Sequence, residues 1–80
     1  MTQKNSSNLI KIGSNMSIKI VSPDVNVLFS YNTPVAARIN DEFVSTSTHW
    51  SQTTTRHIKK WLQGRIAKPV PQNFLDDLAS

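Results

Sequence analysis

The segment Val25–Tyr31, with the sequence VNVLFSY, carries the strongest fold signal in the chain. Every second residue of this segment is apolar or aromatic, and the residues between them are a mixed set. A period of two residues is typical of a β-strand, because successive side chains point to opposite faces of a sheet. The segment therefore predicts a strand with one apolar face and one mixed face.

Three shorter strands are predicted around this one. Upstream, isoleucines alternate around Lys19, which predicts a short edge strand ending at the turn Ser22–Asp24. Downstream, Pro34 interrupts the extended pattern because it lacks an N–H. The next segment places three apolar side chains on one face: Val35, Ala37 and Ile39. Asn40–Asp41 tolerates positive φ, which predicts a tight hairpin to a returning strand at Glu42–Thr46.

The segment Thr53–Gln63 has the signals of an amphipathic helix. Ser51 and Thr53 are both good N-cap residues, and Gly64 stands where a left-handed C-cap belongs. On a helical projection the apolar residues fall on one side, with His57 at the margin: Ile58, Trp61 and Leu62. The polar side holds Arg56, Lys59, Lys60 and Gln63. We therefore predict that this helix buries the first set and turns its cations outward.

The two ends of the chain carry weaker signals. Residues 1–16 are polar and offer little apolar area, which predicts a flexible tail before a single domain at residues 17–80. Prolines interrupt Arg65–Val70, so an irregular segment is expected there. Pro71 suits the first position of a helix, and Pro71–Leu78 is predicted to form two helical turns that present Phe74, Leu75 and Leu78 to the core.

Together these elements predict an α+β fold. Its sheet is expected to be small and antiparallel, with three to four strands. The helix Thr53–Gln63 packs across one face, and the C-terminal turn closes the core. Burial is expected at Val27, Phe29, Val35, Ala37, Ile39, Ile58, Trp61, Leu62, Phe74 and Leu78.

Composition excludes several classes of protein. The chain has 80 residues and no cysteine, so it has no disulfide, no thiolate metal site and no cysteine nucleophile. No apolar run approaches the ~20 residues of a membrane span, and the N-terminus does not resemble a secretory signal. We expect a soluble cytoplasmic protein without a membrane partner.

Charge gives the first positive indication of function. Nine Lys and Arg against five Asp and Glu give a net charge of +4. Five cations lie between residues 56 and 68 with no acid among them, and Trp50 lies just ahead of the helix. The candidate partner-binding residues are therefore Arg56, Lys59, Lys60, Arg65, Lys68 and Trp50. Such a segment favours an anionic partner, although a solvated helix face carries the same pattern.

Catalytic and metal-binding patterns are weak. His49 and His57 are the only histidines, and no spacing of acids completes a metal site around them. Ser51 and His57 are the residue types of a catalytic nucleophile and its base, but nothing beyond residue type supports that role. Neither a nucleophile elbow nor a glycine-rich phosphate loop is present. His57 is expected to donate a hydrogen bond to a loop carbonyl. We predict no enzyme activity, no metal and no cofactor.

Three segments together resemble a known family pattern. They are Tyr31–Ala36 (YNTPVA), Trp50–Leu62 (WSQTTTRHIKKWL) and Val70–Leu75 (VPQNFL). In this order they resemble small domains of unknown function encoded by bacteriophages, prophages and plasmids, with Tyr-x-Thr-Pro-Val-Ala and Ser-x-Thr-Thr-x-x-His motifs. The resemblance covers Phe29–Leu78. It implies a mobile-element accessory protein and brings no reaction or functional residue with it.

Two functions follow as expectations. The first is a non-catalytic phage or mobile-element protein that binds a host macromolecular target stoichiometrically, the expected partner being a host or phage protein complex with an acidic surface. Its sharpest form is an inhibitor of host defence of the anti-CRISPR type. The alternative is a nucleic-acid-binding module without sequence specificity that uses the basic helix face.

Overall fold

The computed structural model describes residues 9–80 and arranges them as one sheet between two helices. The strands are β1 (Leu9–Gly13), β2 (Met16–Ser22), β3 (Val25–Ser30), β4 (Thr33–Ile39), β5 (Glu42–Thr46) and β6 (Lys68–Val70). The helices are α1 (Gln52–Leu62) and α2 (Gln72–Ala79). The fold is α+β as predicted, but the sheet has six strands rather than three or four.

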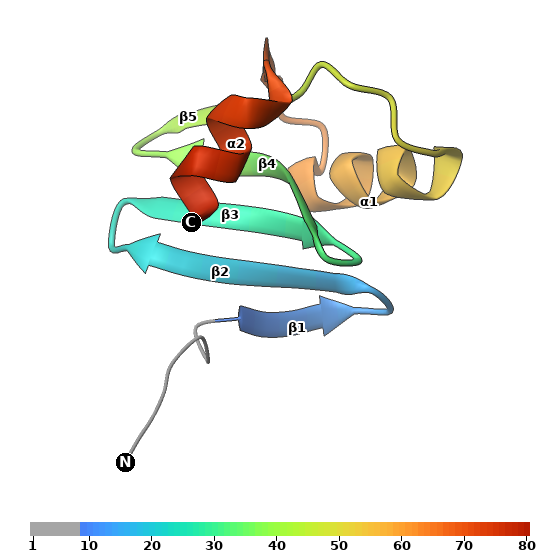
Figure 1. Ribbon diagram of the computed structural model, residues 1–80, viewed down its shortest axis with the longest axis horizontal. Coiled ribbons are helices and arrows are strands. Elements are labelled where there is room, and N and C mark those ends of the chain that lie inside the picture. Colours follow the sequence, from blue (N-terminus) through green and yellow to red (C-terminus); the bar gives the residue numbers. More distant parts are fainter. Residues whose placement is uncertain (1–8) are drawn as a thin grey trace.

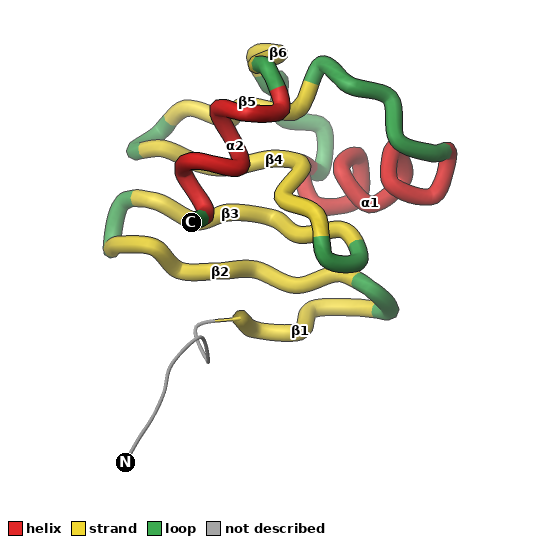
Figure 2. The backbone as a smooth tube through the Cα atoms, viewed as in Figure 1, coloured by secondary structure: helices red, strands yellow, loops and turns green. Residues whose placement is uncertain are grey.

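The strands lie in the sheet in their order along the chain, from β1 to β6 (Figure 2). Neighbouring strands are antiparallel except β5 and β6, which are parallel and are joined through α1. The Asn40–Asp41 hairpin is confirmed, and Asn40 has the positive φ of 56° that such a turn requires. The irregular segment predicted at Arg65–Val70 instead ends in β6.

The N-terminal part of the chain differs from the predicted tail. Leu9–Gly13 pairs with β2, and Met16 is buried in the core with 4% of its surface exposed. Residues 1–8 of that tail lie outside the described residues. No helix in the described range 9–80 is long and apolar enough to cross a membrane.

The two helices lie on opposite faces of the sheet, and each covers its own apolar cluster (Figure 1). Against α1 the buried residues are Met16, Leu28, Val35 and Ala36. On the α2 side they are Val27, Ala37, Val44, Leu75 and Ala79. The single core beneath one helix that the sequence predicted is therefore divided in two, and the strongly alternating face of β3 packs against α2.

A β-bulge explains part of this division. Leu28 pairs with Ala36 and Phe29 with Pro34, so Val35 has no direct partner in β3. The extra residue places Val35 with Ala36 on the α1 side, whereas Ala37 lies on the α2 side. The prediction that Val35 shares a face with Ala37 is wrong for this reason.

The C-terminal helix also corrects the predicted core. Leu75 is fully buried, whereas Phe74 is 42% exposed. Leu75 and Ala79 are four residues apart on α2 and face the sheet together. Leu78 packs at the edge of the same cluster, as predicted.

Candidate functional site

The outer side of α1 carries a cluster of exposed cations. Arg56, Lys59 and Lys60 are all exposed, and no acid is present anywhere in the helix sequence. Their spacings of three and four residues make them neighbours on the helix surface. We call these three residues the α1 cationic surface. Like charges at these spacings cost the helix about 0.2–0.5 kcal/mol per pair, so the cluster lowers helix stability.

The inner side of α1 fixes this orientation. Ile58 and Trp61 pack against the cluster of Met16, Leu28, Val35 and Ala36. The Trp61 ring also meets the ring of Phe43 edge to face, with 5.5 Å between ring centroids. Because the apolar side is anchored to the sheet, the cations are directed to solvent, as the sequence predicted.

Polar contacts at the start of α1 add to this anchoring. Ser51 is the N-cap, and its hydroxyl accepts a hydrogen bond of 3.0 Å from the N–H of Thr54. At the other end the left-handed C-cap is Gln63, with φ of 52°, and not Gly64 as predicted. The helix therefore begins and ends one residue earlier than the predicted Thr53–Gln63.

A buried polar cluster joins α1 to β3. Ser30 is 1% exposed, and its hydroxyl oxygen lies 3.0 Å from Thr54 Oγ1 and 2.7 Å from His57 Nδ1. His57 was expected to bond to a loop carbonyl, and its partner is this hydroxyl instead. Thr54 and His57 therefore both hydrogen-bond to one buried serine and join α1 to β3.

The Ser30–His57 pair has the residue types of a catalytic dyad, but Ser30 is buried and joins α1 to β3. A nucleophilic serine needs its oxygen open to a substrate, and here the oxygen is covered by α1. Among residues 9–80 no group of three or more histidines or acids is arranged to hold a metal ion. What the site offers chemically is exposed positive charge.

Tyr31 stands beside this cluster in an uncommon backbone conformation. Its φ is 58°, in the left-handed region that bulky residues rarely adopt. Its ring lies 5.9 Å from the His57 ring between centroids, and 51% of the residue is exposed. An aromatic side chain held at a conformational cost on the surface marks a candidate contact residue, which the sequence analysis did not include.

Replacing Tyr31 by glycine should give a more stable protein than replacing it by alanine. Both variants lose the ring, but only alanine keeps a Cβ in the left-handed conformation, which costs about 1–2 kcal/mol. Urea unfolding of the two variants measures the difference, with wild type as reference. If the alanine variant is as stable as the glycine variant, or more stable, Tyr31 carries no backbone strain.

Gln72 connects the remaining motif segments. Its side-chain amide donates to the Pro34 carbonyl at 2.7 Å and to Asp76 at 3.0 Å, and its Oε1 accepts from the Trp50 indole at 3.0 Å. The Val-Pro-Gln segment therefore ties the start of β4 to the loop before α1. Trp50 is 49% exposed, so part of its ring remains open to solvent.

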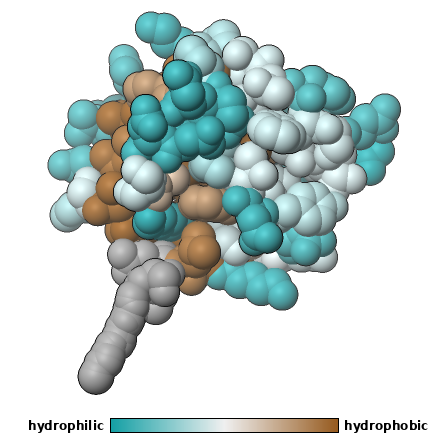
Figure 3. Space-filling view, viewed as in Figure 1, coloured by the Kyte–Doolittle hydropathy of each residue, from teal (hydrophilic) through white to brown (hydrophobic). Residues whose placement is uncertain are grey.

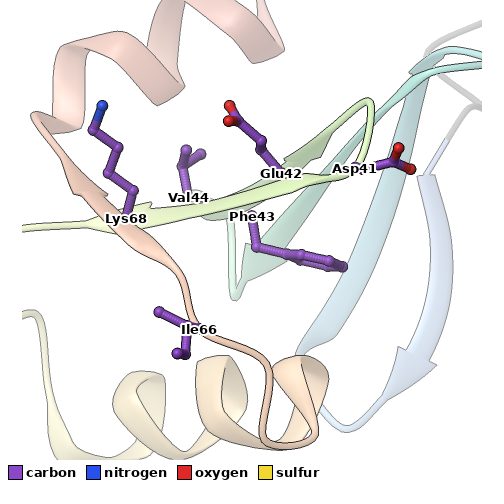
Figure 4. Close-up of a pocket in the computed structure, with 6 residues that line it drawn as sticks. All are labelled: Asp41, Glu42, Phe43, Val44, Ile66 and Lys68. Carbon is purple, nitrogen blue, oxygen red and sulfur yellow. The ribbon is translucent and has the colours of Figure 1, made fainter.

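Arg65 and Lys68, the other two predicted cations, lie outside the α1 cationic surface. Arg65 follows α1 and stacks its guanidinium 5.4 Å from the centroid of the Phe43 ring. Lys68, on β6, pairs with Val44 of β5, and its side chain points toward the α2 side of the sheet (Figure 4). It lines a hollow of about 320 Å³ together with Asp41, Glu42, Phe43, Val44 and Ile66. The structure thus separates Lys68 from the helix cations and places it at a hollow that Asp41 and Glu42 also line.

Comparison with known proteins identifies the family of this chain. A family model described as "Family of unknown function (DUF8033)" matches residues 1–77, so the chain belongs to that family. The match includes residues 1–28, which the motif resemblance left out. No curated protein and no solved structure is similar enough to the chain to count as a match.

Proposed function

We propose that this member of the DUF8033 family is a non-catalytic binding protein that docks on an acidic protein surface through the α1 cationic surface. One observation carries the proposal: Arg56, Lys59 and Lys60 are exposed side by side on a helix with no acid, whose opposite side is anchored in the core. Such a concentration of like charge costs helix stability, and an anionic partner would offset that cost.

The size of the cluster supports a protein partner over nucleic acid. Three phosphate contacts give a salt slope of about −2.7, and so an affinity loss of only about 40-fold between 50 and 200 mM salt. Binding supported by so few contacts is weak at physiological salt. Lys68 does not extend the surface, because it lies on the other face of the sheet. Tyr31, next to His57 of α1, supplies the kind of exposed aromatic residue that dominates protein interfaces.

A narrower proposal concerns origin and target. The Tyr-x-Thr-Pro-Val-Ala and Ser-x-Thr-Thr-x-x-His motifs resemble those of phage and plasmid proteins, and small proteins of this kind act stoichiometrically on host machinery. We therefore propose that the chain is a phage or mobile-element accessory protein acting in the bacterial cytoplasm. Inhibition of a host defence complex, as by anti-CRISPR proteins, is the most specific form of this proposal.

Affinity capture tests the proposal. The full chain is immobilised and exposed to bacterial lysate, either untreated or treated with nuclease, at about 100 mM salt, an ionic strength at which charged surfaces still attract over about 10 Å. We expect a specific protein to be retained and to elute as salt rises. If only nucleic acid is retained, and nuclease treatment removes everything, the protein-partner proposal is wrong.

Nucleic-acid binding is the second candidate, because Trp50 is half exposed just ahead of α1 and can offer its ring to a base. A gel shift with single- and double-stranded DNA and RNA at about 20 mM salt tests it, since phosphate contacts are strongest at low ionic strength. A shift that disappears when Arg56, Lys59 and Lys60 are all replaced by alanine supports this candidate. The absence of a shift at low salt rules it out.

A further inference from the structure

Within residues 9–80, the first strand of the sheet has no strand on its outer side. β1 and β6 are the two edges of the sheet, and the helices pack over its middle, where α1 contacts β3 and β4 and α2 contacts mainly β4. Along an edge strand, half of the backbone N–H and C=O groups have no partner within the sheet. Such an edge can accept another strand by main-chain hydrogen bonding.

The two edges differ in how well they are protected. β6 has only three residues and carries Pro69 at its centre, and both features discourage pairing with another chain. β1 has five residues, and no proline interrupts it. Its apolar side chains are exposed: Leu9 at 48%, Ile10 at 49% and Ile12 at 43%. β1 carries one cation, Lys11, and a bulge between Lys11 and Gly13, but it is longer than β6 and contains no proline, so it is the less protected of the two edges.

An apolar row ends abruptly at this edge. Ile10 pairs with Ile18, and Ile18 pairs with Leu28, so the three side chains share the α1 face of the sheet. The row runs from the buried core through the half-buried Ile18 to the exposed Ile10. On the opposite face, Figure 3 shows hydrophobic surface next to the start of β1. Both faces thus offer apolar area to a strand that continues the sheet.

We propose that β1 pairs antiparallel with β1 of a second copy of this chain, forming a two-fold dimer with one continuous sheet. The occupant follows from complementarity: the exposed apolar side chains of β1 match those of a second β1, and among residues 9–80 β1 is the less protected of the two sheet edges. A two-fold axis brings the same strand to itself in the antiparallel direction.

The side chains favour a two-fold axis through Ile10. In that register Ile10 faces Ile10 of the second copy, and Lys11 faces Leu9 of the second copy. The apolar row then continues across the dimer, and the two Lys11 charges do not oppose each other. Because paired residues share a face, both α1 helices lie on the same side of the joined sheet. The inference does not depend on the proposed function, but the dimer would present two α1 cationic surfaces in the same direction.

Sedimentation equilibrium of the full chain tests this pairing. We expect the mass to rise with concentration from 9.0 kDa toward twice that value. Each chain has a net charge of +4, so added salt should strengthen the dimer, opposite to its effect on binding of an acidic partner. Ile10→Lys places two cations opposite each other and should weaken the dimer by about tenfold or more. Ile66→Lys is the matched control, because Ile66 is 91% exposed away from β1 and should leave the dimer unchanged.

Complementation tests the register. A mixture of the Ile10→Lys and Ile10→Glu variants should dimerise more strongly than either variant alone, because opposite charges then meet at the two-fold axis. Circular dichroism checks that both variants keep the wild-type fold. A mixture no stronger than its components contradicts the register through Ile10.

Three results would overturn the dimer itself. The first is a wild-type chain that stays monomeric up to about 500 µM, a concentration at which even weak pairing would be detected. The second is an Ile10→Lys variant that dimerises as strongly as wild type. The third is a dimer that forms only after residues 1–8 are removed, since the edge would then be covered by the N-terminal segment of the same chain.

Discussion

Replacing Leu75 by alanine should lower the free energy of unfolding by about 3 kcal/mol. Leu75 is fully buried between α2 and the sheet, where it contacts the cluster of Val27, Ala37 and Val44. Removing its side chain leaves a cavity between α2 and the sheet and loses the apolar contacts with this cluster. For a domain of this size the loss corresponds to a melting temperature lower by about 12–24 °C.

Phe74→Ala is the matched control for this prediction. Phe74 is the neighbouring residue on the same helix, but it is 42% exposed. We expect it to cost less than about 1 kcal/mol. Thermal unfolding followed by circular dichroism compares the two variants. A larger loss from Phe74→Ala than from Leu75→Ala would mean that α2 faces the sheet with its other side.

Trp61→Ala should also destabilise the protein by about 3 kcal/mol, enough to unfold a large fraction of so small a domain. The Trp61 ring packs on the cluster beneath α1 and edge to face on Phe43, 5.5 Å away. Its loss would also remove one of the contacts that hold Phe43 in place under the Arg65 guanidinium.

The second tryptophan provides the comparison. Trp50 is 49% exposed, and its indole makes one hydrogen bond, to Gln72. Trp50→Ala is therefore expected to cost about 1 kcal/mol. Chemical denaturation distinguishes the two variants. An unchanged unfolding midpoint for Trp61→Ala would show that Trp61 is not part of the core and that α1 is oriented differently.

Local sequence patterns predicted the parts of the fold that depend on local signals. The alternation in Val25–Tyr31 identified β3, and the turn residues Asn40–Asp41 identified the hairpin between β4 and β5. In α1 the N-cap serine and the helical spacing of Ile58 and Trp61 agreed on one helix with its cations outward. In each case a single stretch of chain contains both the signal and its physical cause.

The features that sequence analysis did not predict depend on distant partners. β1 and β6 are strands because β2 and β5 pair with them, and neither has a strong pattern of its own. The bulge at Val35 changes the face of a strand without changing its alternating sequence. Ser30 looks like an ordinary polar residue of a strand until α1 brings Thr54 and His57 to it.

In the candidate site, too, features with a local signal could be predicted, whereas features that depend on distant partners could not. The outward direction of Arg56, Lys59 and Lys60 could be predicted from helical spacing alone. The separation of Lys68 from them could not, because it depends on the parallel pairing of β6 with β5. Tyr31 became a candidate only through its backbone conformation and its position beside His57.

The most direct test of the α1 cationic surface compares Arg56→Glu with Lys68→Glu in the affinity capture. Both changes alter the charge by the same amount at an exposed residue, on opposite faces of the sheet. A glutamate in place of Arg56 precedes Lys59 and Lys60 by three and four residues, so it should stabilise α1 by about 0.5 kcal/mol. We predict that Arg56→Glu melts no lower than wild type yet loses the captured protein, whereas Lys68→Glu retains it. Full capture by a folded Arg56→Glu variant would contradict the proposed docking surface.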